Sequence, residues 1–130
     1  MSDPIPAKKI KLLLVEDEPS VIELMNIYLS RRGYEIFNVA DGSEVMDKVR
    51  SLKPDLVILD IMLPKLNGFE VCSLIKSDPA LKNIPVMILS ALVQKTEIEM
   101  GIRMGADLYM TKPFQNSELL ANVEKLLGKR

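Results

Sequence analysis

Short apolar runs alternate with longer segments of helical periodicity along this chain, and that alternation limits the folds open to it. One such apolar run covers residues 56–59 and stops at Asp60, between Pro54 and Pro64. A run of that kind predicts a strand buried on both faces, as the strands of parallel sheets are. Strands are expected at residues 9–16, 34–39, 56–60, 85–89 and 108–110.

The segments between these runs have helical spacing. Helices are expected at residues 19–32, after the turn at 41–43, and at 67–76, 93–104 and 115–127. The fourth is the weakest, because Gly101 lies inside it. Five strands alternating with five helices predict an α/β fold, a doubly wound five-stranded parallel sheet in a single domain. Its core should span about residues 10–128, with loose ends at 1–8 and 128–130.

Composition excludes several function classes. The chain has 130 residues, a net charge of −1, no histidine and one cysteine, Cys72. Without histidine there is no Ser-His-Asp triad, no histidine metal site and no self-phosphorylation on histidine. Without a basic excess, no direct contact with nucleic acid is expected. No apolar stretch reaches membrane-spanning length and no secretion signal opens the chain, so the expectation is a cytoplasmic protein without membrane contact. Cys72, within an expected helix, should be a buried structural thiol.

Polar side chains stand where the expected strands end. The first strand ends in Glu16 and Asp17, the third in Asp60 and the fourth in Ser90, while the fifth leads into Lys112. In a doubly wound sheet these ends converge on one crevice. Carboxylates held that close repel one another and require a cation, for which oxygen ligands favour Mg²⁺. Such a site suits phosphoryl transfer, in which an aspartate can be the nucleophile and form an acyl phosphate.

Each of these residues also has an ordinary structural explanation. Glu16 and Asp17 could belong to a solvated helix start. Ser90 could be a turn residue, Lys112 a surface lysine, and Asp60 a polar end to its strand. It is their joint placement at four strand ends that favours a functional site.

The chain resembles the receiver domain of two-component response regulators from about residue 11 to residue 127. The segments that carry the resemblance are 13–19, 54–64, 67–68, 85–91 and 105–114. No single segment would suffice, but together they are highly specific. The resemblance implies the flavodoxin-like strand order 2-1-3-4-5.

The resemblance also implies roles for residues of the site. Asp60 matches the phosphoacceptor, and Asp17 matches the direct Mg²⁺ ligand. Glu16 would act on the metal through water, and the backbone carbonyl of Met62 would complete the ligands. Lys112 matches the lysine that pairs with phosphoryl oxygens, and its bond to the following proline is usually cis in the family. Glu16 stands where aspartate is commoner, a mild departure from the pattern.

Signalling would run through Ser90 and Tyr109. Ser90, where threonine is commoner, matches the hydroxyl that contacts the phosphoryl group. Tyr109 matches the aromatic switch that turns inward when that hydroxyl moves. The face formed by the fourth helix, fifth strand and fifth helix would then change for a downstream partner or effector domain. The phosphoryl group would come from a histidine kinase or a histidine phosphotransfer protein, and the chain would be a signalling phosphoacceptor rather than an enzyme.

Three other classes of protein have to be compared with this pattern. A haloacid-dehalogenase-type phosphatase needs a second acid two residues after the nucleophile, where Met62 stands. A dinucleotide-binding domain needs a glycine-rich turn after its first strand, where residues 16–19 are Glu-Asp-Glu-Pro. A receiver-like scaffold that binds partners without phosphorylation stays open, as does the choice between a single-domain regulator and a piece of a longer one.

Overall fold

One parallel sheet organises the computed structural model, which describes residues 9–128. Its strand order is β2-β1-β3-β4-β5, so the implied flavodoxin-like order is confirmed. The strands are β1 (Lys11–Val15), β2 (Glu35–Val39), β3 (Leu56–Asp60), β4 (Val86–Ser90) and β5 (Leu108–Thr111). The helices are α1 (Pro19–Ser30), α2 (Val45–Leu52), preceded by the short 3₁₀ helix η1 (Gly42–Glu44), α3 (Gly68–Ser77), α4 (Lys95–Arg103) and α5 (Asn116–Leu126).

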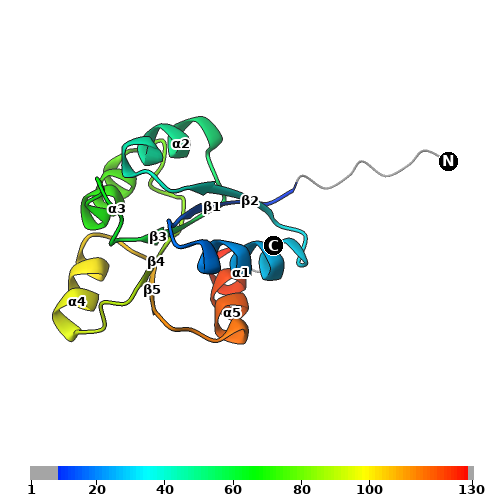
Figure 1. Ribbon diagram of the computed structural model, residues 1–130. Coiled ribbons are helices and arrows are strands. Elements are labelled where there is room, and N and C mark those ends of the chain that lie inside the picture. Colours follow the sequence, from blue (N-terminus) through cyan, green and yellow to red (C-terminus); the bar gives the residue numbers. More distant parts are fainter. Residues whose placement is uncertain (1–8, 129–130) are drawn as a thin grey trace.

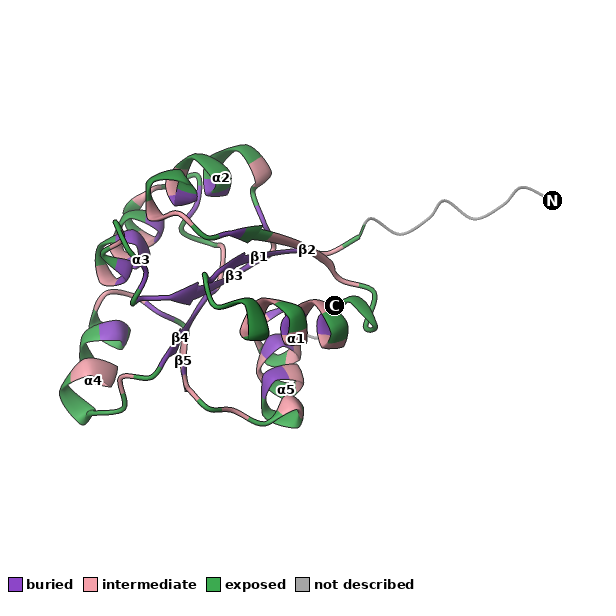
Figure 2. Ribbon diagram, viewed as in Figure 1, coloured by how far each residue is buried: buried purple, intermediate pink, exposed green. Residues whose placement is uncertain are grey.

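Helices cover both faces of the sheet. Figure 1 shows α1 and α5 side by side on one face and α2, α3 and α4 on the other. Successive side chains of a strand point to opposite faces, so each strand contributes to both layers. In β3, Val57 and Leu59 join the core under α2 and α3, while Leu56 and Ile58 join the core under α1 and α5. Every residue of β3 is therefore buried (Figure 2), as its continuous apolar run predicted.

Two aspartates fix the strand register at the edge where the strands begin. Asp55 accepts a hydrogen bond from the Lys11 N–H at 2.8 Å through its side chain and donates its own N–H to the Lys11 carbonyl at 2.8 Å. Asp107 repeats the arrangement with Val86, at 2.8 Å and 2.9 Å. Because paired strands keep one register along their length, these two pairs of hydrogen bonds also determine which residues lie next to one another at the opposite edge of the sheet.

Element boundaries differ from the predicted ones by at most two residues. Strand β4 runs on to Ser90, because Ser90 pairs with Thr111 of β5. Helix α4 begins at Lys95 and not at Val93, since Gln94 precedes it and donates its N–H to the Glu97 carboxylate at 3.1 Å. Periodicity marks the apolar face of a helix, but the capping contacts decide where it starts.

Cys72 has no exposed surface, so the prediction of a buried thiol is confirmed. The expected loose ends at 1–8 and 128–130 fall outside the described residues, apart from Gly128, whose N–H donates to the Lys125 carbonyl at 3.2 Å. Among residues 9–128, no helix combines the length and apolar character that crossing a membrane requires.

Candidate functional site

Strand register brings the predicted polar residues to one edge of the sheet. Val15 lies opposite Leu59, and the residues that follow them are Glu16 and Asp60. On the other side of β3, Asp60 pairs with Leu89 of β4. The next β4 residue is Ser90, whose backbone carbonyl accepts the N–H of Lys112 at 2.8 Å. The polar residues at the ends of β1, β3, β4 and β5 therefore lie at a single site.

Three carboxylates form the acidic part of this site. One oxygen each from Glu16, Asp17 and Asp60 lies within 4.8 Å of the others. Asp17 is exposed, whereas Glu16 has no exposed surface and Asp60 is 6% exposed. Glu16 Oε2 accepts the N–H groups of Asp17 and Glu18, each at 3.2 Å. Burial raises the pKa of Glu16 above its ordinary value, against the opposing effect of the Lys112 ammonium.

Lys112 supplies the positive charge. Its ammonium lies 2.8 Å from Glu16 Oε1, 3.0 Å from Asp60 Oδ2 and 3.8 Å from a Glu18 oxygen. The contact with Asp60 has hydrogen-bond geometry, whereas the shorter contact with Glu16 is an ion pair without it. Burial alone would lower the pKa of Lys112, but the carboxylates of Glu16 and Asp60 outweigh burial and raise it. The bond between Lys112 and Pro113 is cis, as the resemblance implied.

The donor set fits a hard cation. Glu16 Oε1 is a buried side-chain oxygen that makes no hydrogen bond within the described chain. It belongs to a cluster of carboxylate oxygens, which are the ligands that Mg²⁺ prefers. Met62 lies beside this cluster, with its N–H donated to Asp60 Oδ1 at 2.9 Å and its side chain 57% exposed. That the backbone carbonyl of Met62 completes the ligand set stays a prediction.

Ser90 and Tyr109 meet at the loop after β4. Ser90 has no exposed surface, and its Oγ accepts the N–H of Leu92 at 3.0 Å. Tyr109, in β5, donates its hydroxyl hydrogen to the backbone carbonyl of Leu92 at 2.7 Å. Leu92 thus connects the hydroxyl at the site to the tyrosine predicted as a switch.

Asn38 was missed by the sequence analysis. From the edge strand β2, its side-chain amide donates to the carbonyls of Leu14 at 2.9 Å and Glu16 at 3.2 Å. These bonds hold the end of β1, from which the acidic loop departs. The only hint of this role in the sequence is that Asn38 interrupts the expected strand at 34–39 with an amide side chain. Such a side chain in an edge strand commonly just faces solvent.

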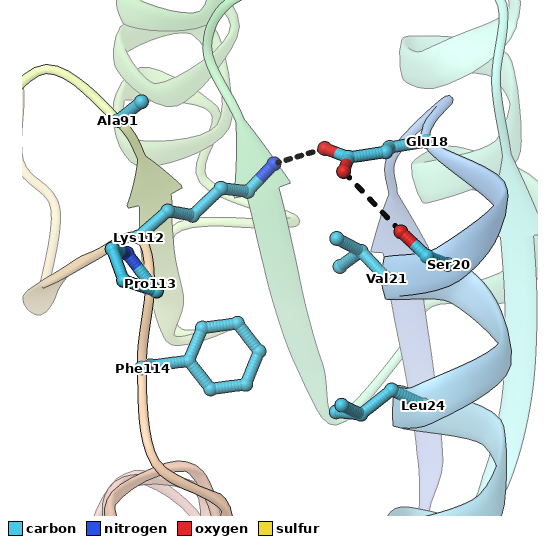
Figure 3. A pocket seen from close by; sticks show the side chains of 8 residues that line it. All are labelled: Glu18, Ser20, Val21, Leu24, Ala91, Lys112, Pro113 and Phe114. Atoms are coloured by element: carbon cyan, nitrogen blue, oxygen red, sulfur yellow. Dashed lines mark hydrogen bonds and ion pairs between the residues drawn. The ribbon is translucent and has the colours of Figure 1, made fainter.

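A groove opens beside Lys112, between α1 and the segment that joins β5 to α5. It encloses about 450 Å³. In Figure 3 the Lys112 side chain points to Glu18, which accepts the Ser20 hydroxyl at 3.3 Å. Below this polar rim, Phe114 faces Val21 and Leu24 across the groove. The groove therefore has apolar walls, and its charged end, formed by Lys112 and Glu18, lies next to the acidic cluster.

Comparisons with known proteins agree on one family. A family model described as the response regulator receiver domain matches residues 12–124. The chain is 40% identical over 117 residues to the alkaline phosphatase synthesis transcriptional regulatory protein PhoP of Bacillus subtilis (strain 168), covering 90% of this chain and 48% of PhoP. It is 38% identical to the DNA-binding response regulator MtrA of Mycolicibacterium smegmatis, covering 90% of this chain and 50% of MtrA.

A solved structure gives the same assignment. The phosphorylated cyanobacterial phytochrome response regulator RcpA superposes with a TM-score of 0.79 and 35% sequence identity, over 92% of this chain and 91% of RcpA. The chain spans about half the length of the curated relatives it matches. The absence of a basic excess concerns these 130 residues, and it does not extend to the parts of the DNA-binding relatives that they leave uncovered.

Proposed function

This chain belongs to the response regulator receiver domains, and from that premise we propose that Asp60 accepts a phosphoryl group from a phosphohistidine on a partner protein. One observation carries the proposal: the nearly buried carboxylate of Asp60 belongs to an acidic cluster suited to a cation and lies 3.0 Å from the ammonium of Lys112. Phosphoryl transfer needs positive charge around the moving group, and Lys112 together with a cation held by the acidic cluster would supply it.

In the proposed step, a carboxylate oxygen of Asp60 attacks phosphorus in line with the leaving nitrogen. The P–N bond breaks, its electron pair returns to the partner's imidazole, and an acyl phosphate forms. Lys112 exchanges part of its contact with Asp60 for one with a phosphoryl oxygen. Mg²⁺, held by Asp17, Asp60, the Met62 carbonyl and, through water, Glu16, would neutralise the remaining charge. Hydrolysis of the same phosphate would be the chain's only other reaction.

The partners follow from this chemistry. A histidine kinase or a histidine phosphotransfer protein would supply the phosphoryl group, because the chain has no histidine of its own. The groove beside Lys112 offers such a donor an approach with apolar walls. The phosphate adds roughly two negative charges. Ser90 would contact the phosphate, and Tyr109 would pass the change to the face formed by α4, β5 and α5.

Intact-mass measurement with a small phosphodonor such as phosphoramidate, in the presence of Mg²⁺, tests the proposal. Wild type should gain one phosphoryl group, Asp60→Asn should gain none, and the exposed control Asp47→Asn should behave as wild type. A scaffold without phosphoacceptor activity would leave the mass unchanged in all three proteins. Continuous phosphate release from an added phosphomonoester would favour the phosphatase.

A further inference from the structure

Gly101 is the only residue of α4 that is buried, and it lies against a ring. A Cβ atom at this position would stand 2.9 Å from Cδ2 and 3.2 Å from Cε2 of Tyr109. It would also stand 2.9 Å from Cδ1 of Ile88. Carbon atoms in ordinary contact are about 3.5 to 4.0 Å apart, so the Tyr109 ring occupies space that any side chain at this helical position would need.

The placement of that ring affects the phosphorylation site through two hydrogen bonds. The Tyr109 hydroxyl donates to the Leu92 carbonyl at 2.7 Å, and the Leu92 N–H donates to Ser90 Oγ at 3.0 Å. Leu92 lies in the loop between β4 and α4, and both of its backbone groups are engaged. If the ring were displaced, the hydrogen bond from Tyr109 to the Leu92 carbonyl would be lost. The loop would then be held only by the hydrogen bond from the Leu92 N–H to Ser90.

We propose that Gly101 is a positioning residue for Tyr109: its missing side chain lets the ring pack against α4, and the packed ring fastens the loop that is bonded to Ser90. The packing itself is independent of the proposed function, whereas its consequence for signalling rests on it. From the sequence alone, Gly101 indicates only a weak helix. Here the glycine is required by the neighbouring ring.

Helix propensity and ring packing predict opposite effects for Gly101→Ala. Alanine forms helices far better than glycine. If Gly101 had no packing role, replacing it with alanine would therefore make the protein more stable. If the ring needs the space, the new methyl group must displace it, because the ring turns about its side-chain bonds more easily than the backbone of α4 moves. The stability gained from helix propensity would then be cancelled or reversed, because the ring would lose its packing against α4 and its hydrogen bond to Leu92.

A double-mutant cycle separates these cases and uses no phosphodonor, so its failure is distinct from failure of the proposed function. Gly101→Ala is made in wild type, in Tyr109→Ala and in Ile88→Val, and urea midpoints are measured. The substitution should lower or leave unchanged the midpoint in wild type, raise it in Tyr109→Ala, and give no rise in Ile88→Val. An equal rise in all three backgrounds, or a rise in Ile88→Val alone, would overturn the proposal.

Fluorine NMR on protein labelled with 3-fluorotyrosine reports the ring directly. The chain has three tyrosines, and Tyr109→Phe assigns the relevant resonance. In Gly101→Ala the Tyr109 resonance should move toward the position of the urea-unfolded protein, with Tyr28 and Tyr34 unchanged. An unmoved Tyr109 resonance would contradict the assignment. If Gly101→Ala fails to fold alone, recovery of folding in Tyr109→Ala supports the proposal, and failure there as well refutes it.

Discussion

The ammonium of Lys112 lies 2.8 Å from Oε1 of Glu16, a carboxylate with no exposed surface. This pair joins the end of β5 to the end of β1, across β3 and β4. Removing the cation would leave buried negative charge uncompensated, which is strongly destabilising. Lys112 therefore holds the acidic site together before any phosphoryl group arrives.

Lys112→Met should lower the free energy of unfolding by about 3 kcal/mol at pH 8, measured by urea titration without Mg²⁺. The loss should shrink toward pH 5. Burial raises the pKa of Glu16, so protonation favours the folded state at low pH, and this contribution disappears as the pH rises through the folded pKa. Lys95→Met is the control, because Lys95 is 89% exposed and pairs with Glu99 only at 3.9 Å. A loss equal to that of the control, or independent of pH, would contradict this role.

Asp17→Asn should weaken Mg²⁺ binding and slow phosphorylation. Asp17 is the exposed member of the acidic cluster, so the substitution removes a ligand charge without burying a new group. Isothermal titration with Mg²⁺ measures the first effect, and the rate of mass gain with phosphoramidate at limiting Mg²⁺ measures the second. Phosphorylation at the wild-type rate under those conditions would remove Asp17 from the ligand set.

The side chains past which a hydrolytic water would reach Asp60 are expected to be apolar. Met62 and Leu92 lie two positions after Asp60 and Ser90, and neither side chain can orient a water molecule by hydrogen bonding. The phosphorylated form should therefore be long-lived, and Met62→Asn combined with Leu92→Lys should shorten its half-life several-fold. Equal half-lives at saturating Mg²⁺ would show that access at these two positions does not set the rate.

Cys72 should be inert in the folded protein. Burial raises the pKa of its thiol to about 11, so at pH 8 the reactive thiolate should be roughly 100-fold rarer than in the unfolded chain. Alkylation by iodoacetamide should be slower by at least that factor without urea than with it. Because the folded pKa is raised, stability should also fall as the pH rises from 9 toward 11, and Cys72→Ala should lack that part of the decline. Rapid alkylation of the native protein would contradict both expectations.

The sequence predicted the sheet and the residues at its edge because both follow from patterns along the chain. A continuous apolar run covers residues 56–59, and the predicted strand ends carry Glu16, Asp60 and Ser90. Contacts across the fold were not predictable in the same way. The amide of Asn38 under the acidic loop depends on register, and the ring of Tyr109 against Gly101 depends on a helix placed over β5. No local pattern encodes either contact.

Trapping the acyl phosphate identifies the aspartate that is phosphorylated. Borohydride reduces an aspartyl phosphate to homoserine, so the phosphorylated protein is reduced, digested and sequenced by tandem mass spectrometry. Homoserine is expected at position 60 alone, dependent on both phosphodonor and Mg²⁺, with Asp17 and Asp55 unmodified. Homoserine at another aspartate, or none in protein that has gained a phosphoryl group, would contradict the assignment of Asp60 as the phosphoacceptor.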